Sequence, residues 1–166
     1  MNTGVRRIAI AGLLGAMAVV LAMSPIGRIP VPWTGVNATT MHIPAIIGGI
    51  LEGPAVGAGV GLIFGFFSFT TSGGFFTDPL VAILPRLFIG VVAGWVFRAT
   101  GRAGWAAAAG TATNTLGVLG MMGIRGYLPW KALGVIAFTH GIPEIVLAVV
   151  VVSLFQRKVR ALAKEA

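Results

Sequence analysis

The chain has 166 residues, of which 57% are hydrophobic and only 10% are charged, whereas soluble domains carry about 25% charged residues. A chain this apolar cannot shield its side chains from water, so we expect lipid to be its solvent and exclude a large catalytic domain outside the membrane. Twelve Lys and Arg against four Asp and Glu give a net charge of +8, which fits the basic loops of membrane proteins. The sequence shows no basic face interleaved with aromatic residues, so it gives no indication of nucleic-acid binding.

The N-terminus is a short basic segment, Met1–Arg7, followed by an apolar run, Ile8–Met23. A secretory signal peptide shares this pattern, and Ala22-Met23-Ser24 resembles a cleavage site. Because the rest of the chain is equally hydrophobic, we interpret the run as the first membrane-spanning helix. Three prolines then predict a loop over Pro25–Val36.

Five further apolar runs predict helices separated by turns that contain Gly, Pro or charged residues. They are Asn37–Leu51, Ala55–Phe69, Pro79–Phe97, Trp105–Met122 and Trp130–Phe155, and a basic tail, Gln156–Lys164, follows. Glycines at four-residue spacing predict faces where helices approach closely in lipid: Gly57, Gly61 and Gly65, then Gly90 and Gly94. No linker divides the chain. The sequence therefore predicts an all-α integral membrane protein with six transmembrane helices in a single domain, 1–166.

The basic residues predict the orientation. With an inner N-terminus, eight of the twelve lie inside: Arg6, Arg7, Arg98, Arg102, Arg157, Lys158, Arg160 and Lys164. Three lie outside, Arg28, Arg125 and Lys131, and Arg86 falls within a helix. This bias satisfies the positive-inside rule when six spans put both termini in the cytoplasm.

Three strongly polar residues fall inside predicted spans: Arg86, Asn114 and Glu144. An intramembrane charge costs about 2.5–3.5 kcal/mol, so such residues mark a function or a pairing partner. One interpretation is an Arg86–Glu144 ion pair that joins two helices. Another is a small-molecule pocket in which Arg86 meets a carboxylate or phosphate. Asn114 fits either an interhelical hydrogen bond or a ligand contact.

Two histidines leave a further alternative open. His140 precedes Glu144 by one helical turn, and with His42 the pair has the residue types of a metal site. An intramembrane metal-dependent or hydrolytic enzyme is thus an alternative, although one such spacing is a weak pattern and we expect no metal or other cofactor. No phosphate-binding loop is present, so uphill transport needs a partner or an ion gradient. An ion-coupled carrier or channel remains a second alternative, without a detectable internal repeat.

Several segments together resemble the substrate-binding S components of energy-coupling factor (ECF) vitamin transporters. They are residues 42–54, 57–65 and 79–90, followed by Asn114-Thr115 and Gly141-Ile142-Pro143-Glu144. Pro85-Arg86 and Gly141-x-Pro143-Glu144 are the more specific features. The segments around His42 and Arg86 most resemble the branch that includes pantothenate carriers, with cobalamin-type S components next.

The resemblance implies a high-affinity vitamin-binding subunit and not an enzyme. It implies capture of the vitamin at the outer side of a prokaryotic plasma membrane. The partners implied are a transmembrane coupling subunit and two ATPase subunits, which supply the ATP hydrolysis. Members dock through small residues on the first helix, and the matching positions are Ala11, Gly12, Gly15 and Ala16. Internal packing of that helix is the alternative.

The resemblance and the polar residues together predict the substrate contacts. Arg86 is complementary to the carboxylate of pantothenate, and Asn114 and Glu144 to its hydroxyl and amide groups. His42, His140, Trp33 and Phe75 complete the expected substrate-binding set, with Phe76 and Tyr127 as further aromatic residues in outer loops.

Overall fold

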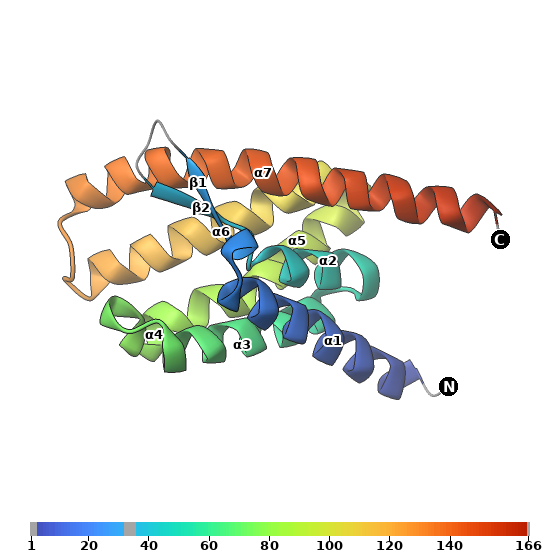
Figure 1. Ribbon diagram of the computed structural model, residues 1–166, viewed down its shortest axis with the longest axis horizontal. Helices are drawn as coiled ribbons and strands as arrows, with labels where there is room; N and C mark the ends of the chain where they lie inside the picture. Colours follow the sequence, from blue (N-terminus) through green and yellow to red (C-terminus); the bar gives the residue numbers. More distant parts are fainter. Residues whose placement is uncertain (1–2, 32–35, 166) are drawn as a thin grey trace.

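The computed structural model describes residues 3–31 and 36–165, and helices dominate them (Figure 1). The α-helices in chain order are α1 Thr3–Met23, α2 Ile43–Glu52, α3 Pro54–Thr71, α4 Pro79–Ala82, α5 Leu84–Thr100, α6 Ala103–Ile124 and α7 Trp130–Glu165. Short 3-10 helices, η1 Pro25–Gly27 and η2 Gly74–Thr77, lie in two of the connections. The predicted basic tail continues α7 as helix.

Four helical segments in the described residues are long and apolar enough to cross a membrane: Gly4–Met23, Pro54–Thr71, Pro79–Thr100 and Trp130–Lys158. The predicted helical, multi-pass membrane class is therefore confirmed. The number of spans stays a prediction, because α2 has only 10 residues and α6, with 22 residues, is not among these four segments.

The helices run between two ends of the molecule. Both termini lie at one end in Figure 1, which we call the terminal end. The turns after α2 and α5 lie at the same end. The connections after α3 and α6 lie at the opposite end, which we call the pocket end. Which end faces the cytoplasm stays a prediction.

Glycines allow α2, α3 and α5 to pack with their backbones in contact. A Cβ atom on Gly57 would lie 2.7 Å from the Cα atom of Gly90 and 2.8 Å from that of Gly49. A Cβ atom on Gly61 would overlap the carbonyl oxygen of Arg86. The predicted close approach of these helix faces is confirmed, and it brings Arg86 directly against α3.

A β-hairpin occupies the segment where the second helix was expected to begin. Strand β1, Arg28–Val31, pairs antiparallel with β2, Val36–Thr39, and Arg28 is aligned with Thr39. The prediction of a helix from Asn37 was therefore wrong. The β-branched residues Val36 and Thr39 favour an extended strand, and α2 starts only at Ile43, where Pro44 suits a first helical turn.

Candidate functional site

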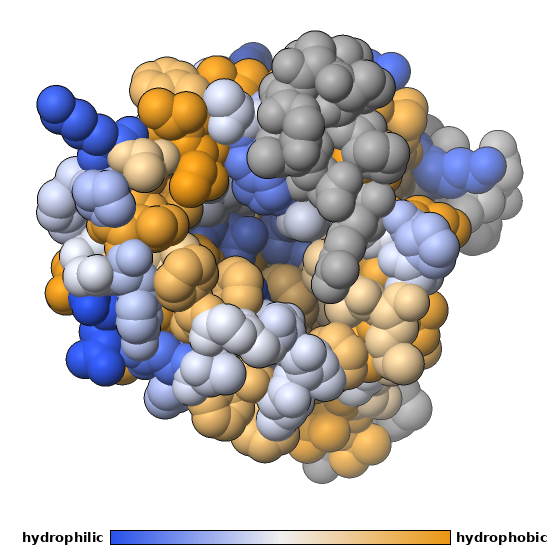
Figure 2. Space-filling model, turned by 60° about the vertical axis from the view of Figure 1, so that its left-hand side comes forward, coloured by the Kyte–Doolittle hydropathy of each residue, from blue (hydrophilic) through white to orange (hydrophobic). Residues whose placement is uncertain are grey.

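A cavity of about 760 Å³ lies at the pocket end. Figure 2 shows it as a hollow with a hydrophilic floor and a largely hydrophobic wall. Its apolar lining comes from Ala22, Met23, Met41, Phe64, Phe67, Phe75, Phe76, Val118, Leu119, Met122, Leu128 and Ile136. Its polar lining is Thr39, Ser68, Thr71, Ser72, Arg86, Asn114, Thr115, His140 and Glu144. A volume of this size is typical of a small-molecule site.

Arg86 lies at the break between α4 and α5. Pro85 has no N–H group for the carbonyl of Val81, so the predicted continuous helix is interrupted at Ile83. The Nη1 atom of Arg86 donates instead to the carbonyl oxygens of Val81, at 3.3 Å, and Ala82, at 2.5 Å. The broken helix thus orients the guanidinium group.

Two aromatic rings hold the Arg86 side chain in place. Its Cζ atom lies 4.9 Å from the ring centroid of Phe64 and 4.8 Å from that of Phe76, distances at which cation–π attraction operates. Arg86 is only 5% exposed, and its Nε atom is buried without a hydrogen-bond partner. With Nη1 already used, the Nε and Nη2 edge is available for a bidentate anion.

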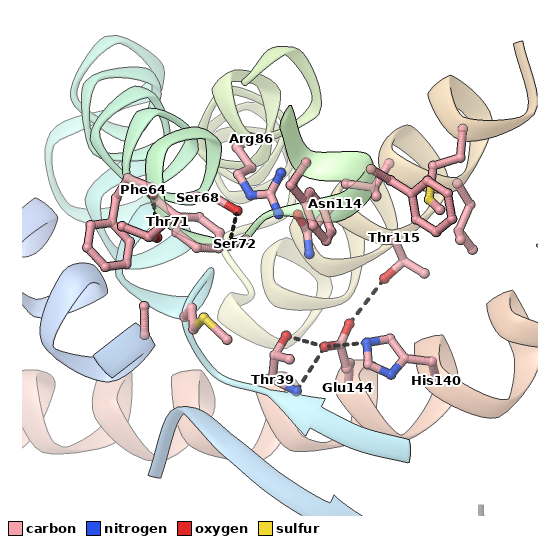
Figure 3. A pocket seen from close by; sticks show the side chains of 18 of the residues that line it. Thr39, Phe64, Ser68, Thr71, Ser72, Arg86, Asn114, Thr115, His140 and Glu144 are labelled. Atoms are coloured by element: carbon pink, nitrogen blue, oxygen red, sulfur yellow. Dashed lines mark hydrogen bonds and ion pairs between the residues drawn. The ribbon is translucent and has the colours of Figure 1, made fainter. Parts of the chain in front are cut away.

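Glu144 lies across the cavity from Arg86 in α7 (Figure 3). Its Oε1 atom accepts hydrogen bonds from the Thr39 backbone N–H at 2.8 Å, from the Thr39 hydroxyl, and from His140 Nε2 at 3.1 Å. Its Oε2 atom accepts from the Thr115 hydroxyl at 3.2 Å. Glu144 is therefore fully engaged and fixes the hairpin to α7 and α6.

The Arg86–Glu144 ion pair, one of the two interpretations of these residues, is not formed between the described side chains. Both residues line the cavity, but Glu144 takes its charged partner from one turn earlier on its own helix. Arg86 takes carbonyl oxygens from the helix break. Neither charge takes the other as its partner, which leaves the space between them for a ligand.

Three other polar side chains face the cavity beside Arg86 (Figure 3). The Oδ1 atom of Asn114 is buried without a hydrogen-bond partner. The hydroxyl oxygens of Ser68 and Ser72 are 3.1 Å apart. One of these hydroxyls donates to the other, so the acceptor keeps its own proton for a further partner. The site thus offers a free acceptor on Asn114 and a free donor on the serine pair.

His42 does not belong to the cavity lining. It is fully buried at the start of α2, and its Nε2 atom is 2.9 Å from the hydroxyl oxygen of Thr111 on α6. His42 therefore takes Thr111 as its partner and does not join His140 and Glu144 in the cavity lining. No three His, Cys, Asp or Glu side chains in the described part of the chain lie together as a metal site.

The loop aromatics have different outcomes. Trp33 lies outside the described residues. Phe75 and Phe76 both line the cavity, as expected of aromatic residues that cover a ligand. Tyr127 packs against Phe75 with ring centroids 5.4 Å apart, so it supports the cavity wall from behind.

Asp78 joins the two connections at the pocket end. Its Oδ2 atom accepts hydrogen bonds from Arg125 Nε at 2.6 Å and from the Tyr127 hydroxyl at 3.0 Å, and its Oδ1 atom accepts from the N–H of Leu80 at 3.0 Å. Burial alone would raise the pKa of Asp78, but these three donors outweigh it and lower the pKa below its ordinary value. The connection that carries Phe75 and Phe76 is therefore tied to the one after α6.

Sequence reasoning missed Thr39, Thr115, Ser68 and Ser72. The hydroxyls of Ser68 and Ser72 are one helical turn apart, and Thr115 is next to Asn114. Hydroxyl groups are so common in membrane helices that such spacing is a weak signal. Thr39 was assigned to a helix and not to a strand, so its contact with α7 had no local signature.

The expected docking residues on α1 divide between two faces. A Cβ atom on Gly15 would lie 2.5 Å from Ile63 Cδ1, and Ala11 lies beside Gly59 of α3. Gly12 has nothing within 4 Å of such an atom, and both Gly12 and Ala16 are exposed. Ala11 and Gly15 therefore serve internal packing, whereas Gly12 and Ala16 are available to a partner.

A multi-pass helical protein with a cavity that carries unpaired polar groups is a solute-binding membrane protein in class. Residues 6–155 match the family described as the substrate-specific component of ECF transporters. The chain belongs to this family, a family of transport components and not of enzymes. The pantothenic acid transporter PanT of Lactococcus lactis subsp. cremoris (strain MG1363) is 33% identical over an alignment of 144 residues, which covers 69% of this chain and 74% of that relative.

Proposed function

We propose that this S component binds pantothenate or a similar small polar vitamin in the cavity at the pocket end. The observation that carries the proposal is the buried guanidinium group of Arg86, which lines the cavity and has no hydrogen-bond partner on Nε. A buried cation with a free fork of donors is complementary to a carboxylate. The similarity to a pantothenic acid transporter supports this vitamin over a cobalamin-type ligand.

The proposed contacts are given in order from the carboxylate of pantothenate to its hydroxyl end. Arg86 and the free proton of the Ser68–Ser72 pair bind the carboxylate. The unpaired Oδ1 atom of Asn114 accepts from the amide N–H or a hydroxyl group. His140, which is part-exposed to the cavity, meets the hydroxyl groups at the far end. The apolar wall encloses the carbon chain between these polar groups.

Glu144 takes a supporting role in this proposal. A free carboxylate near the ligand would repel an anionic vitamin, but both oxygens of Glu144 already accept hydrogen bonds from the protein. Its charge is balanced locally by these donors and by His140. We therefore infer that Glu144 positions Thr39 and His140 around the ligand, and that it does not contact the ligand directly.

The wider arrangement follows the family. We propose that residues 1–166 act as one substrate-binding domain with six spans and both termini in the cytoplasm of a prokaryote. The cavity then opens outward. The proposed partners are an ECF transmembrane coupling subunit and two ATPase subunits, which hydrolyse the ATP. Family membership gives no support to the ion-coupled carrier or to the intramembrane enzyme.

Direct binding tests the substrate. We expect purified protein in detergent to release pantothenate on denaturation, identified by mass spectrometry, and to bind it with a stoichiometry of one in calorimetry. Removal of the carboxylate, as in pantothenol, should abolish most of the affinity. Equal binding of pantothenate and pantothenol would contradict the role of Arg86, and binding of neither would contradict the substrate.

Docking is expected to use the exposed face of α1. Ala16→Leu should leave pantothenate binding unchanged but reduce uptake by cells that express the coupling subunit and ATPases by about tenfold or more, because a large side chain keeps the helices apart. Gly15→Leu is the matched comparison, since it clashes with Ile63 and should lower stability and binding together. Parental uptake by the Ala16 variant would show that this face does not dock.

A further inference from the structure

A second, smaller cavity of about 180 Å³ lies between α2, α5 and α7. Its lining is apolar except for Gln156, and it includes Ile50 from α2, Phe97 from α5, and Val152 and Phe155 from α7. Ile50 and Phe97 lie within one turn of the ends of α2 and α5, and these helix ends lie at the terminal end (Figure 1). The groove therefore plays no part in the vitamin site at the pocket end.

Four cations are adjacent in the chain to residues that line this groove or contact its lining. Arg98 follows Phe97 in α5, and Arg157 and Lys158 follow Gln156 in α7. The backbone N–H of Ala103 donates to Gln156 Oε1 at 3.3 Å, which places Arg102, the preceding residue, at the same end of the groove. All four cations are exposed.

No acidic side chain that the structure describes pairs with these four cations. Glu52 accepts from Arg6 at 2.6 Å and lies 4.0 Å from Arg7. Asp78 pairs with Arg125, and Glu144 pairs with His140. The four basic side chains thus form an uncompensated positive cluster beside an apolar groove.

We propose that this groove and the cluster of Arg98, Arg102, Arg157 and Lys158 bind one anionic phospholipid of the membrane. The headgroup phosphate is held by the cations, and part of an acyl chain lies in the groove against Phe97 and Val152. Basic pockets between membrane helices have the chemistry that recognises anionic headgroups. The positive-inside rule explains the cations alone. The apolar groove beside them also offers a place for the acyl chain.

Native mass spectrometry of the detergent-solubilised protein tests the proposal. Phosphatidylglycerol and phosphatidylcholine are titrated separately, and we expect one phosphatidylglycerol to be retained with at least about tenfold higher affinity. The variant Arg98→Gln/Arg102→Gln should lose this preference. Lys131→Gln, which removes one exposed cation at the pocket end, is the control and should keep it. Ile50→Trp, which fills the groove, should reduce retention while the cations remain.

Three results would overturn the proposal. Equal retention of the two lipids would show that the cluster does not select an anionic headgroup. Displacement of the lipid by glycerol phosphate at equal concentration would show that only the anion binds and that the groove is empty. In a Leu51→Cys variant, a thiol-reactive label reports whether the groove is accessible. If the cysteine is protected from the label only after the coupling subunit is added, the groove is a protein-docking surface. Pantothenate binding is measured on the parental protein and on every variant. Loss of binding in a variant alone indicates loss of folding, and absence of binding in the parental protein contradicts the vitamin proposal, whereas neither result is loss of the lipid.

Discussion

Substitution of Arg86 by Gln is expected to reduce pantothenate affinity by roughly 100-fold or more. The change removes the guanidinium group that we propose meets the vitamin's carboxylate. Loss of one partner from a buried, hydrogen-bonded charge pair costs about 2–5 kcal/mol, where about 1.4 kcal/mol is tenfold. Isothermal calorimetry of the purified variant measures the effect. Arg86→Lys should restore only part of the affinity, because a lysine keeps the charge but not the planar fork of donors.

Two controls separate binding from folding in this experiment. Arg86 Nη1 also satisfies the carbonyl oxygens at the helix break, so each variant is checked for a single peak in size-exclusion chromatography and for its melting temperature. Lys131→Gln removes a cation outside the cavity and should leave affinity unchanged. A folded Arg86→Gln protein that retains parental affinity would refute the carboxylate contact.

Gly90→Ala is expected to destabilise the protein by about 3 kcal/mol, at the upper end of the usual cost of overpacking a core. Its new Cβ atom would overlap the backbone of Gly57, and a backbone cannot move aside as the end of a flexible side chain can. Helices α3 and α5 must separate to accommodate the methyl group, and Arg86 lies one turn before Gly90. A thermal unfolding series in detergent should therefore show a lower midpoint, with weaker pantothenate binding.

Gly134→Ala makes the same chemical change, but we do not expect it to lower the melting midpoint. A Cβ atom on Gly134 of α7 meets nothing within 4 Å, and alanine favours a helix over glycine by about 1 kcal/mol. This variant should melt at or above the parental midpoint. An equal fall in both midpoints would contradict the assignment of the Gly90→Ala effect to the contact of α3 with α5.

Much of the fold was predictable because hydrophobicity and the Gly, Pro and charged residues that end helices are local properties of the sequence. The apolar runs located most helix ends to within a few residues, as at Trp130, where the predicted and observed starts agree. Glycine spacing identified the contact faces of α3 and α5. Arg86, Asn114 and Glu144 were found because a polar group inside an apolar run is costly wherever it lies, and all three line the cavity.

Other features depended on contacts between distant segments. The hairpin that ends at Thr39 forms because two extended segments pair with each other and because Thr39 reaches Glu144, 105 positions away. Its strands have only four residues each, too few to outweigh the apolar run that follows. The position of His42 against Thr111, outside the cavity, likewise follows from which face of α2 meets α6.

The sequence by itself determined the solvent of this protein, the approximate helices, the small faces that let them pack, and the polar residues that lipid does not tolerate. Tertiary structure alone decided which partners satisfy those polar residues. A helical period shows which side chains share a face but not which neighbour that face meets. For that reason the sequence left open whether Arg86 and Glu144 pair, whereas in the fold each takes its partners from nearby groups and both line a cavity. The same distinction assigns Gly15 to the interior and leaves Gly12 exposed, although both belong to one stripe of small residues.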